Sequence, residues 1–451
     1  MTDIAYGIDF GTTNSTVTAV HSTGDVQRLS IDPISFDKAV TRSVIYVDHT
    51  YSMTFGQHAV DTYLKDIAEG RIAQRKQIFT GKHIKIASPA NQGGFVPDQI
   101  VPELIEVEEG EGGRLIQSLK TALASEYIQE FHIFDKKYFV TDLISIYLRH
   151  LKESADAIVG KNVQKAIIGR PVNYVGNNNE LAIARMTEAA QKAGFLEVIF
   201  EYEPIGAAYD YGISVKKAHT SLMFDFGGGT LDLTVMKFPE KKVLATSGIG
   251  LGGDYINSQI FMSDIAVFFG SESTYGEHKL KVSQSIYDQL NNWYSISLMK
   301  TATFDKTLET IGYKHSDPQK LKALKSLVYN NLGFILYENI DRLKIDLSSN
   351  GESIIRMNEI NINFAKQVSR QRFEEIIADD LAQINTLIQN TLDEANLKPE
   401  DIDSIATTGG SSLIPIVQHM LQGMFGNKVR STNAFTSVST GLALRAHQEF
   451  F

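Results

Sequence analysis

Two short stretches of the chain repeat one pattern of residue types that could hold a phosphate group. "GIDFGTTNSTV" begins at residue 7 and "MFDFGGGTLDL" begins at residue 223. Each runs from apolar residues to an aspartate, an aromatic residue and a glycine, then through small polar residues into another apolar run. Glycine-rich turns expose several backbone N–H groups at one point and so form a nest for an anion. The residues that would line the two turns are Gly11, Thr12, Thr13, Asn14, Gly227, Gly228, Gly229 and Thr230.

The aspartates of these stretches predict a metal site between the two turns. Asp9 and Asp225 lie 216 positions apart, which is too far for a solenoid repeat and fits a duplicated domain. Two halves that face each other across a cleft would clamp a polyphosphate from both sides. Mg²⁺ usually takes one or two carboxylates together with waters and phosphate oxygens. We therefore expect Asp9 and Asp225 to anchor Mg²⁺.

A third stretch, "ATTGGSSLIP" from residue 406, has the order of a nucleotide-type turn. A strand leads to a glycine pair and a serine, and a helix follows. The same residues also fit a plain turn between a strand and a helix. The residues concerned are Gly409, Gly410 and Ser411.

Strands alternate with helices along the chain, which predicts an α/β protein. The first 50 residues are rich in β-branched residues with Gly and Asp between them, which is typical of hairpins. Apolar residues at helical spacing predict a helix over 138–158. We expect residues 55–115 to form an insertion or surface loops, residues 277–345 to be mostly helical, and one amphipathic helix to follow Ser369.

Composition excludes several classes of protein. The 451 residues carry a net charge of −10, which argues against nucleic acid or an anionic membrane as the main partner. The chain has no cysteine, so disulfides and thiolate chemistry are excluded and a cytoplasmic location is expected. We see no signal peptide and no apolar run long enough to span a membrane.

Six motifs in order carry a resemblance to a known family. They are "GIDFGTTNS", "IGRPVNY", "FEYEPIGAAYDYG", "FDFGGGTLDLTV", "GLGGDYIN" and "ATTGGSSLIP". Together they resemble the nucleotide-binding domain of DnaK-type heat-shock chaperones, and the short "GRPVNY" and "EYEP" variants are most similar to the YegD-type branch. The resemblance implies an α/β actin-like ATPase with two duplicated ribonuclease-H-like lobes around a nucleotide cleft, and ATP or ADP with Mg²⁺ as its cofactors.

The resemblance also implies roles for single residues. Lys120 in "LIQSLKTALAS" matches a lysine that reaches the γ-phosphate, with Lys82 and Lys85 as alternatives. Glu203 matches a glutamate that holds the water shell of the metal or the attacking water. Asp232 matches an acid near the γ-phosphate and is a candidate proton acceptor. The candidate catalytic residues are Lys120, Glu203, Asp232 and Thr230, and Pro171 matches the proline that acts as a switch between nucleotide states.

The adenosine site departs from the family pattern. Asp341, Lys344 and Ser348 match contacts to ribose and base, whereas Ile345 and Leu413 stand where the family has two arginines beside the purine. Each lost cation–π or stacking contact is worth about 1 kcal/mol, so we expect weaker binding and possible changes in nucleotide choice. The loop "GLGGDYIN", which includes Gly252 and Gly253, is one residue shorter than in the family if Asp254 is aligned with its acid.

These observations predict two lobes and a nucleotide-dependent switch. The first lobe is expected over 1–215 with 430–451 and contains an insertion around 28–135. The second is expected over 216–429 with a helical subdomain around 260–345. We expect slow hydrolysis of ATP, no peptide-binding domain, and a client or co-chaperone that the sequence does not identify. The alternatives are a nucleotide-sensing scaffold with negligible turnover, a polymerising actin-like ATPase and a sugar kinase of the same fold.

Overall fold

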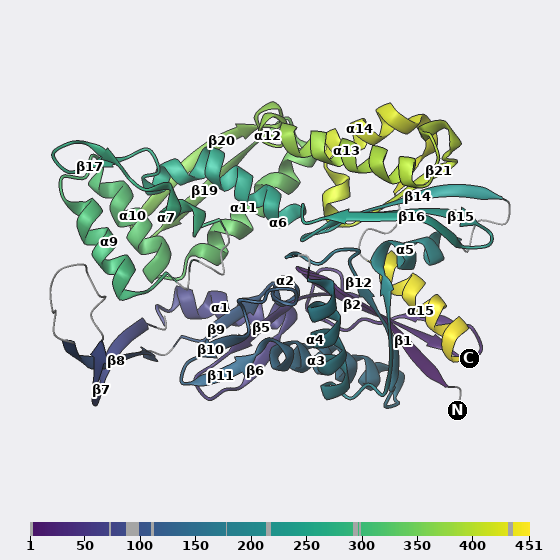
Figure 1. The fold of residues 1–451 in the computed structure, drawn as a ribbon, viewed down its shortest axis with the longest axis horizontal. Helices are drawn as coiled ribbons and strands as arrows, with labels where there is room; N and C mark the ends of the chain where they lie inside the picture. Colours follow the sequence, from purple (N-terminus) through teal and green to yellow (C-terminus); the bar gives the residue numbers. More distant parts are fainter. Residues whose placement is uncertain are drawn as a thin grey trace, which may run out of the picture.

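Two β-sheets with matching strand order form the centre of the molecule (Figure 1). The computed structural model describes residues 3–71, 74–86, 99–109, 112–176, 178–212, 218–291, 296, 299–431 and 436–451. The first sheet has the order β13-β12-β1-β2-β3, and β4 also pairs with β2. Its strands are β1 (Ile4–Phe10), β2 (Asn14–His21), β3 (Val26–Arg28), β4 (Val40–Arg42), β12 (Lys165–Arg170) and β13 (Glu197–Tyr202).

The second sheet repeats the arrangement of the first. Its order is β22-β21-β14-β15-β16. In the first sheet β1 pairs with β2 antiparallel and with β12 parallel, and in the second β14 pairs with β15 antiparallel and with β21 parallel. The repeated sequence pattern thus corresponds to a repeated structural unit. The strands are β14 (His219–Phe226), β15 (Leu231–Phe238), β16 (Lys242–Ile249), β21 (Ser404–Thr408) and β22 (Val429–Ser431).

Strand β1 directs its side chains to opposite faces of the sheet in alternation. Tyr6 and Ile8 pack into a core with helices α3 (Val140–Val159) and α4 (Asn179–Lys192). Ala5 instead packs against α15 (Ser437–Phe450). Asp9 follows Ala5 by four positions, so its side chain leaves the strand on the α15 face.

Strand β14 shows the same alternation in the second sheet. Phe224 and Phe226 belong to the main core of that half, whereas Met223 packs with Ala208 of α5 (Glu203–Gly212). Asp225 shares the face of Met223, so it also leaves its strand toward α5. Helix α5 contacts strands of both sheets, and Figure 1 shows it between them.

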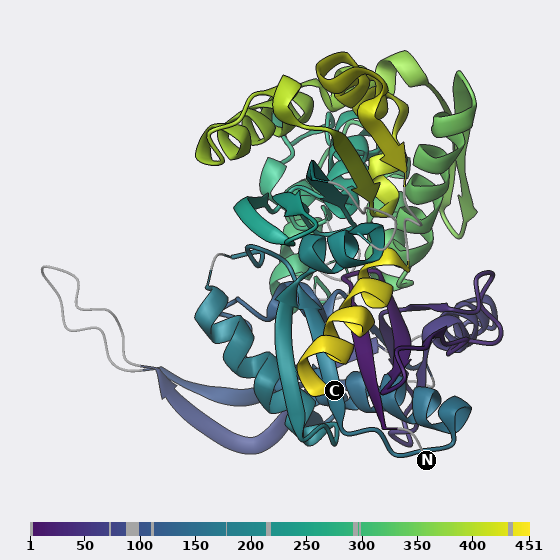
Figure 2. The same ribbon diagram turned by 90° about the vertical axis from the view of Figure 1, so that its right-hand side faces the viewer.

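The helices α5 and α15, both rich in small residues, pack against each other. A Cβ atom on Gly441 of α15 would lie only 1.6 Å from the carbonyl oxygen of Gly206 in α5. Gly7 of β1 approaches α15 in the same way, because a Cβ there would lie 2.2 Å from the backbone nitrogen of Ala443. Figure 2 shows α15 in yellow crossing the strands of the first sheet. The contact between helices therefore depends on glycine at these positions.

The segment between β4 and α3 forms an insertion beside the first sheet. We expected an insertion or surface loops over 55–115, and the expectation of loops was wrong, because this segment contains a three-turn helix and paired strands. The elements of the insertion are β5 (Val44–Val47), β6 (Met53–Phe55), α1 (Gly56–Ala68), β7 (Gln74–Ile86), β8 (Gln99–Glu109), β9 (Arg114–Gln117), α2 (Leu119–Ala122), β10 (Glu130–Ile133) and β11 (Lys136–Phe139).

The second half carries a mostly helical segment between its strands, as the sequence predicts. Its elements are α6 (Gly253–Ile260), β17 (Thr274–Tyr275), β18 (Leu280–Lys281), α7 (Gln284–Asp288), α9 (Ala302–Gly312), α10 (Pro318–Tyr329), α11 (Gly333–Ser349), β19 (Glu352–Glu359) and β20 (Ile362–Ser369). A π-helical turn, Phe261–Ile265, and a 3₁₀ turn, Ala266–Phe269, continue α6.

The single helix expected after Ser369 is divided into two. Ser369 caps α12 (Arg370–Ile376) by accepting a hydrogen bond from the backbone N–H of Arg372, and α13 (Ala378–Glu394) starts after Ile377. Helix α14 (Pro415–Phe425) completes this half. None of the helices in the described residues combines the length and the apolar composition that crossing a lipid bilayer requires.

Candidate functional site

The two glycine turns predicted from the sequence have the same backbone hydrogen bond. The N–H of Gly11 donates to the carbonyl of Asn14 at 3.0 Å, and the N–H of Gly227 donates to the carbonyl of Thr230 at 3.0 Å. Each turn joins two antiparallel strands, β1 to β2 and β14 to β15. The predicted duplication of a strand–turn–strand unit is therefore present in the backbone.

The two turns lie against each other. A Cβ atom on Gly228 would lie 2.5 Å from the hydroxyl oxygen of Thr13, and one on Gly229 would lie 2.6 Å from that of Thr12. A side chain at either glycine would therefore displace one of these hydroxyls. Residues that are more than 200 positions apart thus form one continuous surface of backbone N–H groups and hydroxyls.

Two further loops are attached to the turn at Gly227. The N–H of Gly253 and the hydroxyl of Ser411 both donate to the carbonyl of Gly227, at 3.0 and 2.9 Å. Gly252 lies where a Cβ would be 2.3 Å from the carbonyl oxygen of Gly228. Gly409 has a φ of +79° and leads into Gly410 at the start of a 3₁₀ turn. The structure therefore brings the predicted third stretch and the shortened loop to the second turn.

Four acidic side chains lie together below the turns. Glu203, Asp225 and Asp232 are buried, and Asp9 is partly buried. Burial raises the pKa of Asp9 to about 7, and the nearby charge of Glu203 adds to this rise. Burial likewise raises the pKa of Asp225, with further contributions from Glu203, Asp9 and Asp232. The two metal-site candidates therefore interact with each other although they come from different sheets.

Lys120 supplies positive charge to this cluster. It lies on the short helix α2, is buried, and makes an ion pair with Glu203. Burial alone would lower the pKa of Lys120, but the carboxylates of Glu203 and Asp9 outweigh that effect and raise it. Lys120 is thus held protonated beside Glu203 and Asp9.

Lys82 and Lys85, the alternatives to Lys120, lie on strand β7. Their side chains are outside the described residues, so the position of neither amine is known.

Asp232 connects the two halves of the molecule. It accepts a hydrogen bond at 2.8 Å from the backbone N–H of Val172, which directly follows Pro171. The Asn173 side chain donates to the carbonyl of Gly248 at 3.2 Å, which makes a second link. Burial raises the pKa of Asp232 to about 7, and the charge of Glu203 adds to this rise. The segment that holds the predicted switch proline therefore contacts the predicted proton acceptor.

The acidic cluster has the donor chemistry that Mg²⁺ requires. Asp9, Asp225 and Glu203 are carboxylates close enough to raise one another's pKa, and their mutual repulsion favours a cation near them. In the part of the chain that the structure describes, no three acidic or histidine side chains converge closely enough to coordinate one ion directly. Mg²⁺ usually takes one or two carboxylates and keeps several waters and phosphate oxygens as its other ligands.

The residues expected at the adenosine form a separate polar network. Lys344 makes an ion pair with Asp341 at 2.8 Å and donates to the amide oxygen of Asn257 at 3.0 Å. Asn257 donates in turn to Asp341 at 2.9 Å. Burial would raise the pKa of Asp341, but the charge and hydrogen bond of Lys344, the hydrogen bond from Asn257 and the charge of Arg42 together outweigh burial and lower it. Ser348 lies one turn further along α11 and donates to the carbonyl of Lys344.

The two apolar substitutions in this region are exposed. Ile345 is 65% exposed and Leu413 is 46% exposed. Both side chains lie outside the hydrophobic core and reach the surface, where a ligand could contact them.

Three contributions to the site were not predicted from the sequence. Asn257 links Asp341 to Lys344, and Val172 holds Asp232 through its backbone, which residue type does not reveal. Arg42 makes a two-pronged ion pair with Glu338, with nitrogen–oxygen distances of 2.6 and 3.1 Å. Arg42 lies in β4 and Glu338 in α11, so this pair joins the two halves beside the polar network.

Comparison with known proteins agrees with this architecture. A family model described as "Hsp70 protein" matches residues 112–292 and 328–448. The chain is 28% identical to the chaperone protein DnaK of Emiliania huxleyi, over 98% of this chain and 59% of that relative. It is 26% identical to the chaperone protein DnaK of Cyanidium caldarium, over 97% of this chain and 60% of that relative. It is 27% identical to DnaK of Thermosipho africanus over 74% of this chain and 48% of the relative.

The chain spans about half to three fifths of the length of these curated relatives. The matches confirm the expected two-lobed α/β fold of the actin-like ATPase class, together with ATP or ADP and Mg²⁺ as the cofactors of the family. They do not distinguish the YegD-type branch, which stays a prediction. The family model covers well over half of the chain, with residues from both halves of the molecule, and the protein belongs to the Hsp70 family.

Proposed function

We propose that this chain binds Mg²⁺ with ATP or ADP between its two glycine turns and hydrolyses ATP slowly, as a nucleotide-dependent switch. The observation that carries the proposal is the convergence of both turns on one buried acidic cluster with Lys120 beside it. Backbone N–H groups of the turns and the hydroxyls of Thr12 and Thr13 would bind the phosphates. When bound, Mg²⁺ supplies positive charge to the phosphate oxygens and to Asp9 and Asp225.

The proposed catalytic roles follow from the charges of the cluster. Lys120 would interact with the γ-phosphate, because its amine is protonated and lies next to Asp9. Asp232 is suited to accept a proton from water, since a general base works best when its pKa is close to the pH of the reaction. Glu203 keeps Lys120 in place through the ion pair and would orient water. Thr230 adds a hydroxyl at the second turn.

We propose the same lobe boundaries as the sequence predicts, 1–215 with 430–451 and 216–429. The support is that α15 packs on the first sheet although it follows the second sheet in the chain. The cytoplasmic location expected from the absence of cysteine also stays a prediction, and no client or co-chaperone is identified.

Single-turnover hydrolysis of bound ATP, measured alongside a titration with ADP, tests the proposal. Lys120→Ala and Thr230→Ala should lose most of the hydrolysis and keep ADP binding, because the γ-phosphate that they contact is absent from ADP. Glu203→Gln should be intermediate, since a neutral amide can still orient water. Lys82→Ala is the matched control and should hydrolyse ATP like the wild type.

The same measurements separate the alternatives. A wild type that binds ATP but shows no turnover over hours would support a nucleotide-sensing scaffold instead. Loss of hydrolysis in Lys82→Ala with normal rates in Lys120→Ala would show that the lysine is misassigned. Sedimentation with ATP would reveal a polymerising ATPase.

A further inference from the structure

Lys120 lies on a helix that cannot set its own position. Helix α2 has only four residues, and helices of this length are unstable without contacts from the rest of the protein. No side chain caps its start, where Ser118 has a left-handed φ of +57° that disfavours residues other than glycine. Leu119 and Leu123 pack into the core of the first half. This packing anchors α2, but apolar contacts are non-directional and do not by themselves fix the orientation of the turn.

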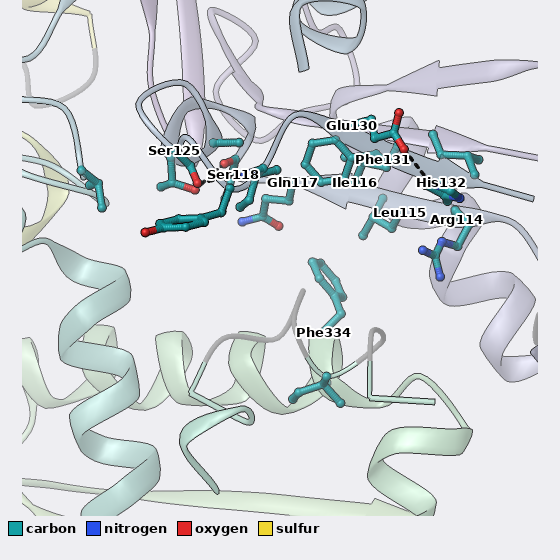
Figure 3. A pocket seen from close by; sticks show the side chains of 18 of the residues that line it. Arg114, Leu115, Ile116, Gln117, Ser118, Ser125, Glu130, Phe131, His132 and Phe334 are labelled. Atoms are coloured by element: carbon teal, nitrogen blue, oxygen red, sulfur yellow. Dashed lines mark hydrogen bonds and ion pairs between the residues drawn. The ribbon is translucent and has the colours of Figure 1, made fainter. Parts of the chain in front are cut away.

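One side of the turn around Lys120 is open. Ser118, Thr121, Ala122 and Ser125 line a cavity of about 910 Å³, and Figure 3 shows Ser118 and Ser125 beside each other on its wall. An open space cannot support α2 on this side, so the position of its last residues depends on contacts made elsewhere.

The guanidinium group of Arg185, on α4, makes such contacts. Its Nη1 lies within hydrogen-bond distance of three backbone carbonyl oxygens, those of Ala122, Leu123 and Ser125, at 2.9, 3.0 and 2.9 Å. An arginine side chain can satisfy the carbonyls at the end of a helix, which have no partner within it. Arg185 is not among the residues that line the cavity, so it holds the turn from another side.

The charge of Arg185 depends on these carbonyls. The side chain is half-buried, and burial lowers its pKa with no carboxylate among the described residues to oppose the change. A charged group that leaves water without an opposite charge needs hydrogen-bond partners to compensate it. The positions of Arg185 and of the turn after Lys120 are therefore coupled.

The segment that precedes α4 contacts the same turn. The side-chain amide of Asn178 donates to the carboxylate of Glu126 at 2.8 Å. A few residues earlier, the backbone N–H of Val172 donates to Asp232. The turn that follows Lys120 and the predicted proton acceptor are therefore attached to one stretch of chain.

We propose that Arg185 is a positioning residue, which holds Lys120 where it contacts the γ-phosphate during hydrolysis. This inference rests on the proposed ATPase function. The hydrogen bonds of Arg185 go to the backbone that follows Lys120, so it acts through α2. Without them, the turn would be free to move toward the cavity and the amine would move away from Glu203. Small displacements of a catalytic group lower the rate strongly.

Single-turnover hydrolysis of bound ATP, with a parallel titration with ADP, tests the effect on catalysis. Arg185→Met keeps the apolar stem and removes the donors, so it should slow hydrolysis about 10- to 100-fold with little change in ADP affinity. Arg185→Lys keeps the charge and an amine donor and should recover part of the rate. Arg149→Met is the matched control, because Arg149 donates to the carbonyl of Lys192 at the end of α4, at 2.6 Å. It should hydrolyse ATP like the wild type, and a wild-type rate in Arg185→Met would overturn the proposal.

A double variant separates the positioning of Lys120 from a general loss of structure. If Arg185 acts through Lys120, Arg185→Met should not slow hydrolysis further once Lys120 is replaced by alanine, because residues that act as a unit are not additive. A further loss in the double variant, as large as that in Arg185→Met alone, would overturn the proposal.

Chemical labelling without nucleotide tests the same link independently of hydrolysis. Lys120 is 7% exposed and paired with Glu203, so acetic anhydride should modify its amine slowly, as mass spectrometry of the digested protein measures. In Arg185→Met the modification of Lys120 should be several times faster, and in Arg149→Met it should match the wild type. Equal labelling of Lys120 in the wild type and in Arg185→Met would overturn the proposal.

Two provisions keep these outcomes distinct. Arg185→Gln, whose side chain is too short to reach all three carbonyls, replaces Arg185→Met if that variant does not unfold cooperatively. Absence of hydrolysis in the wild type would contradict the ATPase function, whereas equal labelling of Lys120 would contradict the role of Arg185 alone.

Discussion

Replacing Asp232 with asparagine tests whether burial and neighbouring charge raise the pKa of this carboxyl group in the folded protein. Asp232 is 1% exposed, and burial with the charge of Glu203 raises its pKa to about 7. An aspartate in an unfolded chain has a pKa of about 3.9. The folded state therefore binds this proton more tightly than the unfolded state does. Stability is lost as the pH rises between the two values and stays low above the higher one.

The magnitude follows from the size of the shift. Between pH 5 and pH 7 the unfolded group is ionised and the folded group is mostly protonated, so the free energy of unfolding falls by about 1.4 kcal/mol per pH unit. This gives a loss of about 2–3 kcal/mol from pH 5 to pH 8. Asp232→Asn cannot ionise and keeps an oxygen that can accept from Val172. The free energy of unfolding of Asp232→Asn, relative to that of the wild type, should therefore rise by about 2–3 kcal/mol from pH 5 to pH 8.

Urea unfolding at pH 5, 6, 7 and 8, with EDTA and without nucleotide, measures this difference. Glu153→Gln on α3 is the matched control, because it removes an exposed carboxylate. Its stability relative to the wild type should change little with pH. A constant difference between Asp232→Asn and the wild type at all four pH values would refute the reasoning, because the folded group would then ionise like an unfolded one.

Three other substitutions test separate parts of the molecule. Asp9→Asn should weaken the magnesium-dependent part of ATP binding in calorimetry, and an unchanged response to EDTA would contradict the metal site. Gly441→Ala should lower the free energy of unfolding by about 3 kcal/mol, the upper end for overpacking, because its Cβ would meet the backbone of Gly206; urea unfolding with wild-type stability would exclude this tight contact. Ile345→Arg should tighten ATP binding by about 1 kcal/mol through stacking on the purine, and an unchanged affinity for ATP in calorimetry would contradict a purine site beside Ile345.

The turns were predictable because their determinants are local. A strand that ends in an aspartate, an aromatic residue and glycine is identifiable from a few neighbouring residues, and its repetition at residue 225 indicated a duplicated unit. The paired sheets with matching order agree with that prediction.

Long-range contacts set the limit of sequence reasoning. The backbone N–H of Val172 reaches Asp232 from 60 positions away, and a backbone donor leaves no trace in residue type. The ion pair between Arg42 and Glu338 depends on how the two halves are oriented. The break at Ile377 is equally hidden, because the apolar spacing continues across it. Each of these features is decided by tertiary packing, which overrides local propensity.

The register of two strands explains how residues that are far apart in sequence form one acidic cluster. Asp9 occupies the strand face that turns toward α15 and Asp225 the face that turns toward α5, because the residues two positions before them, Gly7 and Met223, lie on those faces. Glu203, the first residue of α5, lies close enough to both aspartates for its charge to raise the pKa of each. A shift of either strand by one residue would turn its aspartate to the opposite face. The alternation of side chains between the two faces of each strand therefore fixes two features at once. It places the small residues that let helices approach the sheets, and it places the carboxylates that would hold the metal.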